Sequence, residues 1–272
     1  MKKIRESQLR PPSHKGFSVT KKGKKTPPPS ATSPDEPMRL NKYIAHCGIC
    51  SRRNAVDFIK EGHVFVNGKA VVEPYYEVQP TDAVTFKGKA VRPEVRKVYL
   101  LLNKPKDVIT TASDERGRKT VMDIVGNKIK ERIFPVGRLD RTTTGLLLLT
   151  NDGDLAQKLS HPSYSVKKIY HVALNKPLER SDFELIAKGL ELEDGIATID
   201  KLHFVDSKNK AEVSIELHIG KNRIVRRIFE HMGYEVACLD RVYYAGLTKK
   251  DLPRGFFRHL TDQEVVMLKH FT

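Results

Sequence analysis

The chain of 272 residues is strongly basic, since 49 Lys and Arg outnumber 33 Asp and Glu and leave a net charge of +16. This excess favours a polyanionic partner, nucleic acid before a membrane surface. No run approaches the roughly 18 apolar residues of a membrane span, and no secretory segment opens the chain, so we expect a cytoplasmic protein without membrane association.

Residues 1–37 have the composition of a disordered basic tail. They combine nine Lys or Arg with three acidic residues and the run "TPPPS", and they hold few apolar residues. Such a tail either adds nonspecific affinity for phosphate or acts as a solubilising extension, and both alternatives stay open.

Residues 38–97 predict a compact module followed by a linker. Apolar residues at helical spacing indicate two short helices, with Ser51 as the N-cap of the second. Asn67 and Gly68 form the strongest hairpin-turn signal of the chain, and "AVTFKG" adds a further strand. Cys47 and Cys50 form a C-x-x-C that lacks the two further ligands of a structural zinc site, so we expect small buried packing residues there.

This segment resembles the small RNA-binding module first seen in ribosomal protein S-four. The pattern that carries the resemblance is R-L-x-K-x-apolar from Arg39, S-R-R from Ser51 and G-x-V-x-V-N-G from Gly62. The resemblance implies RNA contacts at Arg39, Lys42, Ser51, Arg52, Arg53 and Lys69. A solvated charged face is the alternative for the same cations.

After a linker that contains Pro93, residues 98–272 predict a second domain. Strands are expected around 98–103, 132–137, 145–150, 167–174, 198–205, 211–219 and 235–244, and helices near 120–125, 154–160, 181–188 and 223–232. Ser181 and Glu184 match a capping box at the start of one helix. Many strands interrupted by short helices indicate an α+β fold with a largely antiparallel sheet.

Within this domain Asp140 has unusual neighbours. It lies between Arg138 and Arg141, and it precedes Gly145 and four leucines that predict a strand buried on both faces. We therefore expect the carboxylate at the mouth of a core strand. A turn residue, a helix cap or a surface charge is the alternative for any single aspartate.

The expected helix at 223–232 has an apolar face and a cationic face, the latter formed by Arg223, Arg226 and Arg227. Taken alone, a cationic face of this kind is more often a solvated or phosphate-binding surface than a catalytic one. Beside a lone, partly desolvated carboxylate, it also favours the charged form of that acid.

Four segments carry a second resemblance: "GRLDRTTTGLLLLTNDG", "NKP" at 103–105, "KKIYHV" at 167–172 and "IGKNRIVRRI" at 219–228. They are similar to motifs of the ribosomal-RNA pseudouridine synthases that carry an S-four-like module, over about residues 38–268 of this chain. "LEDG" at 192–195 leans toward the branch that acts on large-subunit RNA. The resemblance implies an RNA-binding module followed by a mixed-sheet α+β catalytic domain. It also implies isomerisation of a specific uridine to pseudouridine with no cofactor and no metal.

The same resemblance implies roles for single residues. Asp140 is the sole catalytic aspartate, and Arg226 forms an ion pair with it. Tyr170 stacks on the target base, Ile219 forms an apolar wall, and Arg138 fills the space that the uridine leaves in its helix. We further expect RNA contacts from Lys104, Lys221, Arg223 and Arg227. The expected partner is ribosomal RNA or an assembling ribosomal subunit, bound by a monomer.

Two other classes of protein are weighed against this interpretation. A glycosidase needs a second carboxylate, for which Asp152 and Asp154 are candidates, although "NDGD" also predicts a turn with a helix cap. A noncatalytic RNA-binding ribosome-assembly factor would explain the charge and the basic module. It would not require the lone aspartate together with the tyrosine and arginine motifs.

Overall fold

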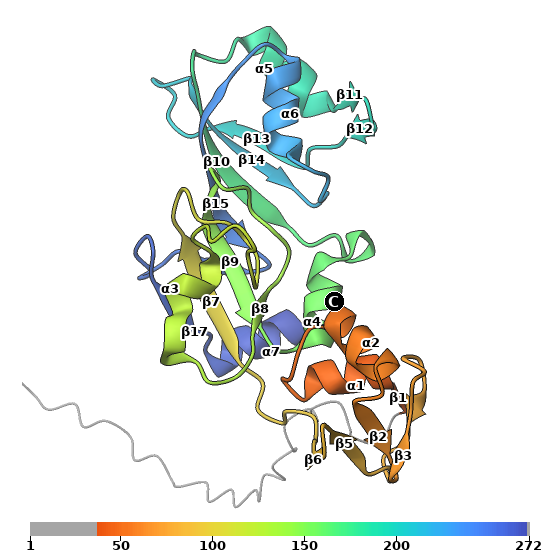
Figure 1. The fold of residues 1–272 in the computed structure, drawn as a ribbon. Coiled ribbons are helices and arrows are strands. Elements are labelled where there is room, and N and C mark those ends of the chain that lie inside the picture. Colours follow the sequence, from red (N-terminus) through yellow and green to blue (C-terminus); the bar gives the residue numbers. More distant parts are fainter. Residues whose placement is uncertain (1–36, 271–272) are drawn as a thin grey trace, which may run out of the picture. The chain divides into compact units, whose positions relative to one another are not determined.

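We describe residues 37–270 of a computed structural model (Figure 1). The predicted basic tail, residues 1–37, lies outside this range except for Pro37. Within the described residues, no helix is long and apolar enough to cross a membrane.

The N-terminal segment contains two helices and six short strands. They are β1 (Met38–Arg39), α1 (Leu40–His46), α2 (Arg52–Lys60), β2 (Val64–Val66), β3 (Lys69–Ala70), β4 (Glu77–Val78), β5 (Val84–Phe86) and β6 (Lys89–Ala90). Four of the strands form a sheet in the order β3-β2-β5-β6, and β1 pairs with β4. The buried residues of this segment, which include Leu40, Ile44 and Ile59, form a core of their own.

Two local predictions for this segment are confirmed. The Oγ of Ser51 accepts a hydrogen bond from the Asn54 N–H at 3.1 Å, as expected of the N-cap of α2. Asn67 and Gly68 have φ values of 50° and 79° and join β2 to β3, because both positions of such a tight turn require positive φ.

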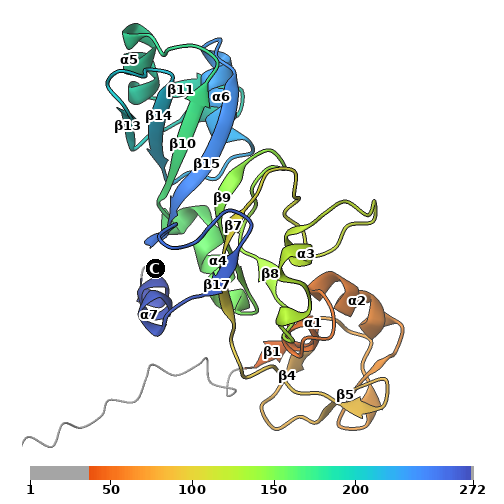
Figure 2. The ribbon, with the colours of Figure 1, turned by 90° about the vertical axis from the view of Figure 1, so that its left-hand side faces the viewer.

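Nine of the later strands build one sheet. They are β7 (Tyr99–Lys104), β8 (Phe134–Pro135), β9 (Thr144–Thr150), β10 (Lys168–Leu174), β13 (Lys201–Phe204), β14 (Glu212–Leu217), β15 (Val236–Tyr244), β16 (Leu247–Thr248) and β17 (Phe257–His259). The order is β13-β14-β10-β15-β9-β7-β17, with β16 beside β15 and β8 beside β9 (Figure 1, Figure 2). The pairing of β15 with β9 is parallel and the other pairings in this sheet are antiparallel, so the expected mostly antiparallel α+β fold is confirmed.

The helices after residue 98 are α3 (Val121–Val125), α4 (Gly153–Ser160), α5 (Arg180–Lys188), α6 (Ile224–His231) and α7 (Asp262–His270), with 3₁₀ turns η1 (Gly126–Lys128) and η2 (Pro162–Tyr164). The predicted capping box at Ser181 is wrong. α5 begins one residue earlier, with Glu179 at the N-cap and no side-chain cap, so Ser181 already lies inside the first turn. Capping boxes are found instead at Thr120 and Asp123, at the start of α3, and at Thr261 and Glu264, at the start of α7.

The four leucines of β9 are buried because the sheet has a core on each face. Leu147 and Leu149 pack in the core that includes residues of α5 and α6, whereas Leu146 and Leu148 pack with residues of α4 and α7. Alternate side chains of a strand point to opposite faces, so a strand between two cores is apolar at every position.

Candidate active site

Asp140 lies in the loop between β8 and β9, and neighbouring groups hold the backbone on both sides of it. The Thr110 hydroxyl donates to the Leu139 carbonyl at 2.8 Å and accepts the Leu139 N–H at 3.3 Å. On the other side, the Asp107 N–H donates to the Arg141 carbonyl at 2.9 Å. The Asp140 side chain is 36% exposed, so a carboxylate on a fixed backbone remains accessible from outside the fold.

Lys104 is fully buried beneath the same loop. Its Nζ donates to the carbonyls of Thr143 at 2.8 Å, Pro105 at 3.1 Å and Arg141 at 3.3 Å. Burial lowers the pKa of Lys104 to about 8, and the nearby Asp140 carboxylate opposes that shift. The predicted RNA contact from Lys104 is therefore wrong, because a buried ammonium that donates to three backbone carbonyls cannot reach a phosphate.

The arginines of α6 are placed differently from the prediction. In the described part of the chain, the guanidinium within 4.0 Å of the Asp140 carboxylate belongs to Arg223, at 3.9 Å. Arg226 donates instead to the Val236 carbonyl at 2.9 Å and to the Thr142 hydroxyl at 3.2 Å. Arg223 precedes the helix and is exposed, whereas Arg226 lies on the buried side of α6, so Arg226 supports the loop after Asp140 rather than pairing with the acid.

A hollow of about 150 Å³ lies beside the Asp140 loop. Its lining brings together four predicted site residues from separate parts of the chain: Arg138, Tyr170, Ile219 and Lys221. Lys168, Arg241 and Tyr244 also line it and were not predicted. Lys168 had a sequence signal, since it lies two residues before Tyr170 in the same motif, but Arg241 had none.

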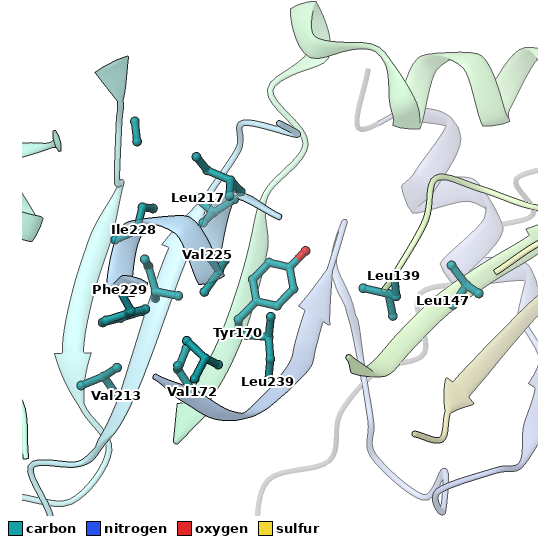
Figure 3. Packing of buried hydrophobic residues seen from close by; sticks show 14 of the residues in the cluster. Leu139, Leu147, Tyr170, Val172, Val213, Leu217, Val225, Ile228, Phe229 and Leu239 are labelled. Atoms are coloured by element: carbon teal, nitrogen blue, oxygen red, sulfur yellow. The ribbon is translucent and has the colours of Figure 1, made fainter. Parts of the chain in front are cut away.

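Tyr170 lies on β10 and is 9% exposed. It is opposite Ile215 on β14 and opposite Arg241 on β15. Figure 3 shows its ring among the buried apolar side chains, near Val225 and Leu239. An aromatic ring held in this way presents a rigid stacking surface.

Lys221 and Arg227, both predicted RNA contacts, have partners within the protein. The Arg227 guanidinium contacts both carboxylate oxygens of Asp194, at 2.7 and 2.9 Å, and the Lys221 Nζ donates to the Asp194 carbonyl at 2.7 Å. The hydrogen bond from Arg227 lowers the pKa of Asp194 to about 2. Asp194 lies in the turn of a hairpin that was not predicted, β11 (Leu190–Leu192) and β12 (Gly195–Ala197).

The predicted RNA contacts of the N-terminal segment divide into two groups. Arg52, Arg53 and Lys69 are exposed, and the exposed Arg39 lies over the ring of Tyr75 at 5.5 Å. Lys42 and Ser51 are already engaged, Lys42 in an ion pair with Asp154 at 2.8 Å and Ser51 as the N-cap of α2. A larger hollow of about 330 Å³ is lined by Lys42, Ser51 and Arg52, and no predicted catalytic residue lines it.

The two candidate second carboxylates of a glycosidase have structural partners. Asp152 is the N-cap of α4 and accepts the Tyr99 hydroxyl at 2.7 Å, and Asp154 pairs with Lys42. This arrangement matches the simpler interpretation of "NDGD" as a turn with a helix cap.

Among residues 37–270, no group of three or more His, Cys, Asp or Glu side chains is placed so that it could hold a metal ion. Cys50 is buried and Cys47 is half-buried. Burial raises the pKa of both thiols, that of Cys47 to about 12, so both stay neutral packing residues at physiological pH.

Comparison with known proteins identifies the class. The family model described as RNA pseudouridylate synthase matches residues 98–231, and the S4 domain model matches residues 38–84. The chain is 44% identical to ribosomal large subunit pseudouridine synthase B of Bacillus subtilis (strain 168), over 85% of this chain and 95% of that protein. It is 36% identical to dual-specificity RNA pseudouridine synthase RluF of Escherichia coli (strain K12), over 86% of this chain and 79% of that protein.

A solved structure has the same fold. The crystal structure of a pseudouridylate synthase superimposes with a TM-score of 0.62 at 27% identity, covering 85% of this chain and 99% of that one. The chain therefore belongs to the RNA pseudouridine synthase family, in the group with an N-terminal S4 domain. This result confirms the predicted family and enzyme class, against both the glycosidase and the noncatalytic alternative.

Proposed function

We propose that this enzyme converts a specific uridine of large-subunit ribosomal RNA to pseudouridine, with Asp140 as its single catalytic carboxylate. The name of the Bacillus subtilis relative and the "LEDG" segment support the large subunit. The observation that carries the role of Asp140 is its position on a loop clamped at residues 139, 141 and 143, beside a hollow lined by Tyr170.

The reaction is an isomerisation and consumes no other reactant. The bond between the ribose C1′ and N1 of uracil breaks, the base rotates, and C1′ bonds to C5, which then loses its proton while N1 gains one. Asp140 acts either as a nucleophile or as the base that assists cleavage of the glycosidic bond. Tyr170 stacks on the base, Ile219 supplies an apolar wall, and Arg138 occupies the place of the uridine in the RNA helix.

The exposed cations of the N-terminal segment are proposed to position the RNA. Arg39, Arg52, Arg53 and Lys69 are exposed and free to contact phosphates, which fix register without reading sequence. We assign residues 38–97 to this RNA-binding module and 98–272 to the catalytic domain, because the buried residues of the first segment form a separate core. The enzyme would act in the cytoplasm as a monomer, on ribosomal RNA or an assembling subunit.

The test is release of tritium from RNA labelled at C5 of uridine. Asp140→Asn should reduce release by at least roughly 1,000-fold while RNA affinity changes by no more than about twofold, since phosphate contacts supply most of the binding. Asp107→Asn is the matched control, because Asp107 is an exposed carboxylate near the same loop with φ 63°, a conformation that Asn also tolerates.

Transcripts of large- and small-subunit RNA should be compared in the same assay. If the Asp140→Asn variant retained turnover, Asp140 would not be the catalytic carboxylate. Release from the small-subunit transcript alone would move the substrate to that RNA without affecting the role of Asp140.

A further inference from the structure

Two cations, the buried Arg241 and the half-buried Lys168, line the hollow beside Tyr170 and have unused hydrogen-bond donors. Arg241 is 3% exposed, its Nε donates to the Leu146 carbonyl at 2.7 Å, and its guanidinium lies 4.4 Å from the centre of the Tyr244 ring. Its Nη2 is buried without a hydrogen-bond partner among the described residues. A buried, charged donor without an acceptor is costly, so this atom is suited to an acceptor that arrives with a ligand.

Lys168 is the second cation. Its Nζ donates to the carbonyls of His218 at 2.8 Å and Val166 at 3.0 Å, which leaves one of its three N–H groups for another acceptor. The pKa of Lys168 is lowered to about 8, mainly by burial and to a smaller extent by the positive charge of Arg241. The two cations are therefore close enough to oppose each other, and no carboxylate of the described residues lies within ion-pair distance of either.

Strand pairing brings these groups to one place. Lys168 and Tyr170 are two residues apart on β10, and across the strand pair they lie opposite Tyr244 and Arg241 of β15. All four side chains line the hollow, together with Arg138 and Lys221 of the predicted site, and no Asp or Glu lines it. The lining thus combines a stacking ring with two cations, Lys168 and Arg241, that have no carboxylate partner among the described residues.

The positive charge of Lys168 and Arg241 favours an anionic ligand over a neutral one in this part of the hollow. Uracil is neutral, so its carbonyl oxygens would satisfy donors but leave two cations without a counter-ion in a poorly solvated site. A phosphodiester supplies both acceptor oxygens and a negative charge, and charge-assisted hydrogen bonds to guanidinium and ammonium groups are the stronger kind. A phosphate attached to the stacked nucleoside meets both requirements.

We propose that Lys168 and Arg241 form a phosphate subsite that binds one of the two backbone phosphates flanking the target uridine while Tyr170 stacks on its base. This proposal rests on the assignment of the hollow as the uridine site, but it does not depend on which ribosomal RNA is the substrate. The substrate unit is then a uridine nucleotide rather than a base alone, and the subsite fixes the ribose relative to Asp140.

Binding of mononucleotides to the full-length protein tests the subsite without any turnover. Uridine 5′-monophosphate or uridine 3′-monophosphate should bind at least about tenfold tighter than uridine in calorimetric titrations at low salt, and inorganic phosphate should compete with the nucleotide. Arg241→Gln and Lys168→Gln should each remove most of this preference, whereas Arg241→Lys should keep part of it because the charge remains. Lys201→Gln, an exposed cation on β13, is the matched control.

A second arm uses the wild-type enzyme and therefore does not depend on the folding of any variant. A neutral methylphosphonate replaces one flanking phosphate of the target uridine in an RNA fragment, and single-turnover tritium release is measured. One of the two flanking substitutions should slow the reaction by about tenfold or more, and the same substitution several nucleotides away should not.

The subsite is refuted if uridine and both monophosphates bind equally to the wild type, or if neither flanking methylphosphonate slows turnover. Failure of the proposed function gives a different result: Asp140→Asn would retain turnover, or large-subunit RNA would not react, while the preference for the phosphorylated nucleoside persisted.

Discussion

The carboxylate of Asp140 lies 3.9 Å from the guanidinium of Arg223, the residue immediately before α6, measured from Oδ2 to Nη1. Arg226, one helical turn further on, contacts the Thr142 hydroxyl instead, and its Nε has no hydrogen-bond partner among the described residues. The counter-ion of the acid and the residue that supports its loop are therefore two different arginines.

Substitution of these two arginines should separate the two effects. The Arg223 pair is half-exposed and long, so Arg223→Ala should lower the single-turnover rate only several-fold, and Arg223→Lys should restore it because the charge is sufficient. Arg226→Ala removes two hydrogen bonds of a buried guanidinium, each charge-assisted bond contributing about 1.5–3 kcal/mol, so it should lower both the rate and the melting temperature substantially. Arg226→Lys should rescue little, because it loses the fork geometry.

Single-turnover kinetics at saturating enzyme, with thermal melts of each variant, provide the measurement. Thr142→Val is the control for the loop contact and should reproduce part of the Arg226→Ala rate defect. If Arg223→Ala reacted at the wild-type rate and Arg226→Lys restored the rate lost in Arg226→Ala, the counter-ion of Asp140 would be Arg226.

Lys104→Met should act on catalysis and not on RNA affinity. The substitution keeps an unbranched side chain but removes the ammonium that donates to the carbonyls of Thr143 and Arg141, so the Asp140 loop should lose its fixed geometry. We expect the rate to fall by roughly tenfold or more, while the dissociation constant changes by less than about twofold. Lys106→Met, an exposed lysine two residues later, should leave both unchanged.

The same variant has a specific pH signature. The pKa of Lys104 is lowered from 10.5 to about 8 by burial, so between these values the unfolded chain binds more protons than the folded one, and stability from this group rises with pH. The wild type should gain up to about 3 kcal/mol relative to Lys104→Met between pH 8 and 10.5 in denaturant unfolding. If the difference in unfolding free energy between wild type and variant stayed constant across that range, the pKa of Lys104 would not be lowered by burial.

Gly145→Ala should be far more destabilising than other glycine substitutions in this chain. A Cβ at Gly145 would lie 2.3 Å from the Arg241 carbonyl oxygen and 2.5 Å from its nitrogen, at the parallel contact of β9 with β15. Since both atoms are backbone, the strands would have to separate, and we expect a loss of at least about 3 kcal/mol of unfolding free energy. Gly117→Ala is the control, because Gly117 also has positive φ but has no atom near its Cβ position, and its loss should be about 1 kcal/mol. Equal losses in urea unfolding would contradict the close approach.

The double variant Arg52→Ala/Arg53→Ala should weaken RNA binding without slowing the chemical step. Both residues are exposed in the first turn of α2, where they can contact phosphates. The slope of the logarithm of the binding constant against the logarithm of salt concentration should become shallower by up to about 2, and the rate at saturating enzyme should stay unchanged. Lys188→Ala/Lys208→Ala, an exposed pair outside the N-terminal segment, is the control. An unchanged salt slope in the arginine variant would exclude these residues from the interface.

Local patterns in the sequence were sufficient for the elements whose causes are local. The hairpin at Asn67 and Gly68, the N-cap at Ser51 and the doubly buried leucines of β9 follow from backbone conformation, hydrogen bonding to the next turn and the period of a strand. The motif spacing also placed Asp140 before a core strand and Tyr170 in a strand, and the structure has both there.

Tertiary structure alone decided which charged residues are buried and which partner each one has. Lys104 and Arg226 each have an exposed cation nearby in the chain, Lys106 and Arg223, and only the packing of β7 under the Asp140 loop and of α6 against β15 distinguishes them from these neighbours. Arg241 enters the hollow beside Tyr170 because β15 pairs with β10, and residues 71 positions apart in the chain (241 minus 170) leave no local signal of that contact. The physical reason is that hydrophobic periodicity reports the face of an element, whereas the partner of a charge depends on which distant element packs against that face.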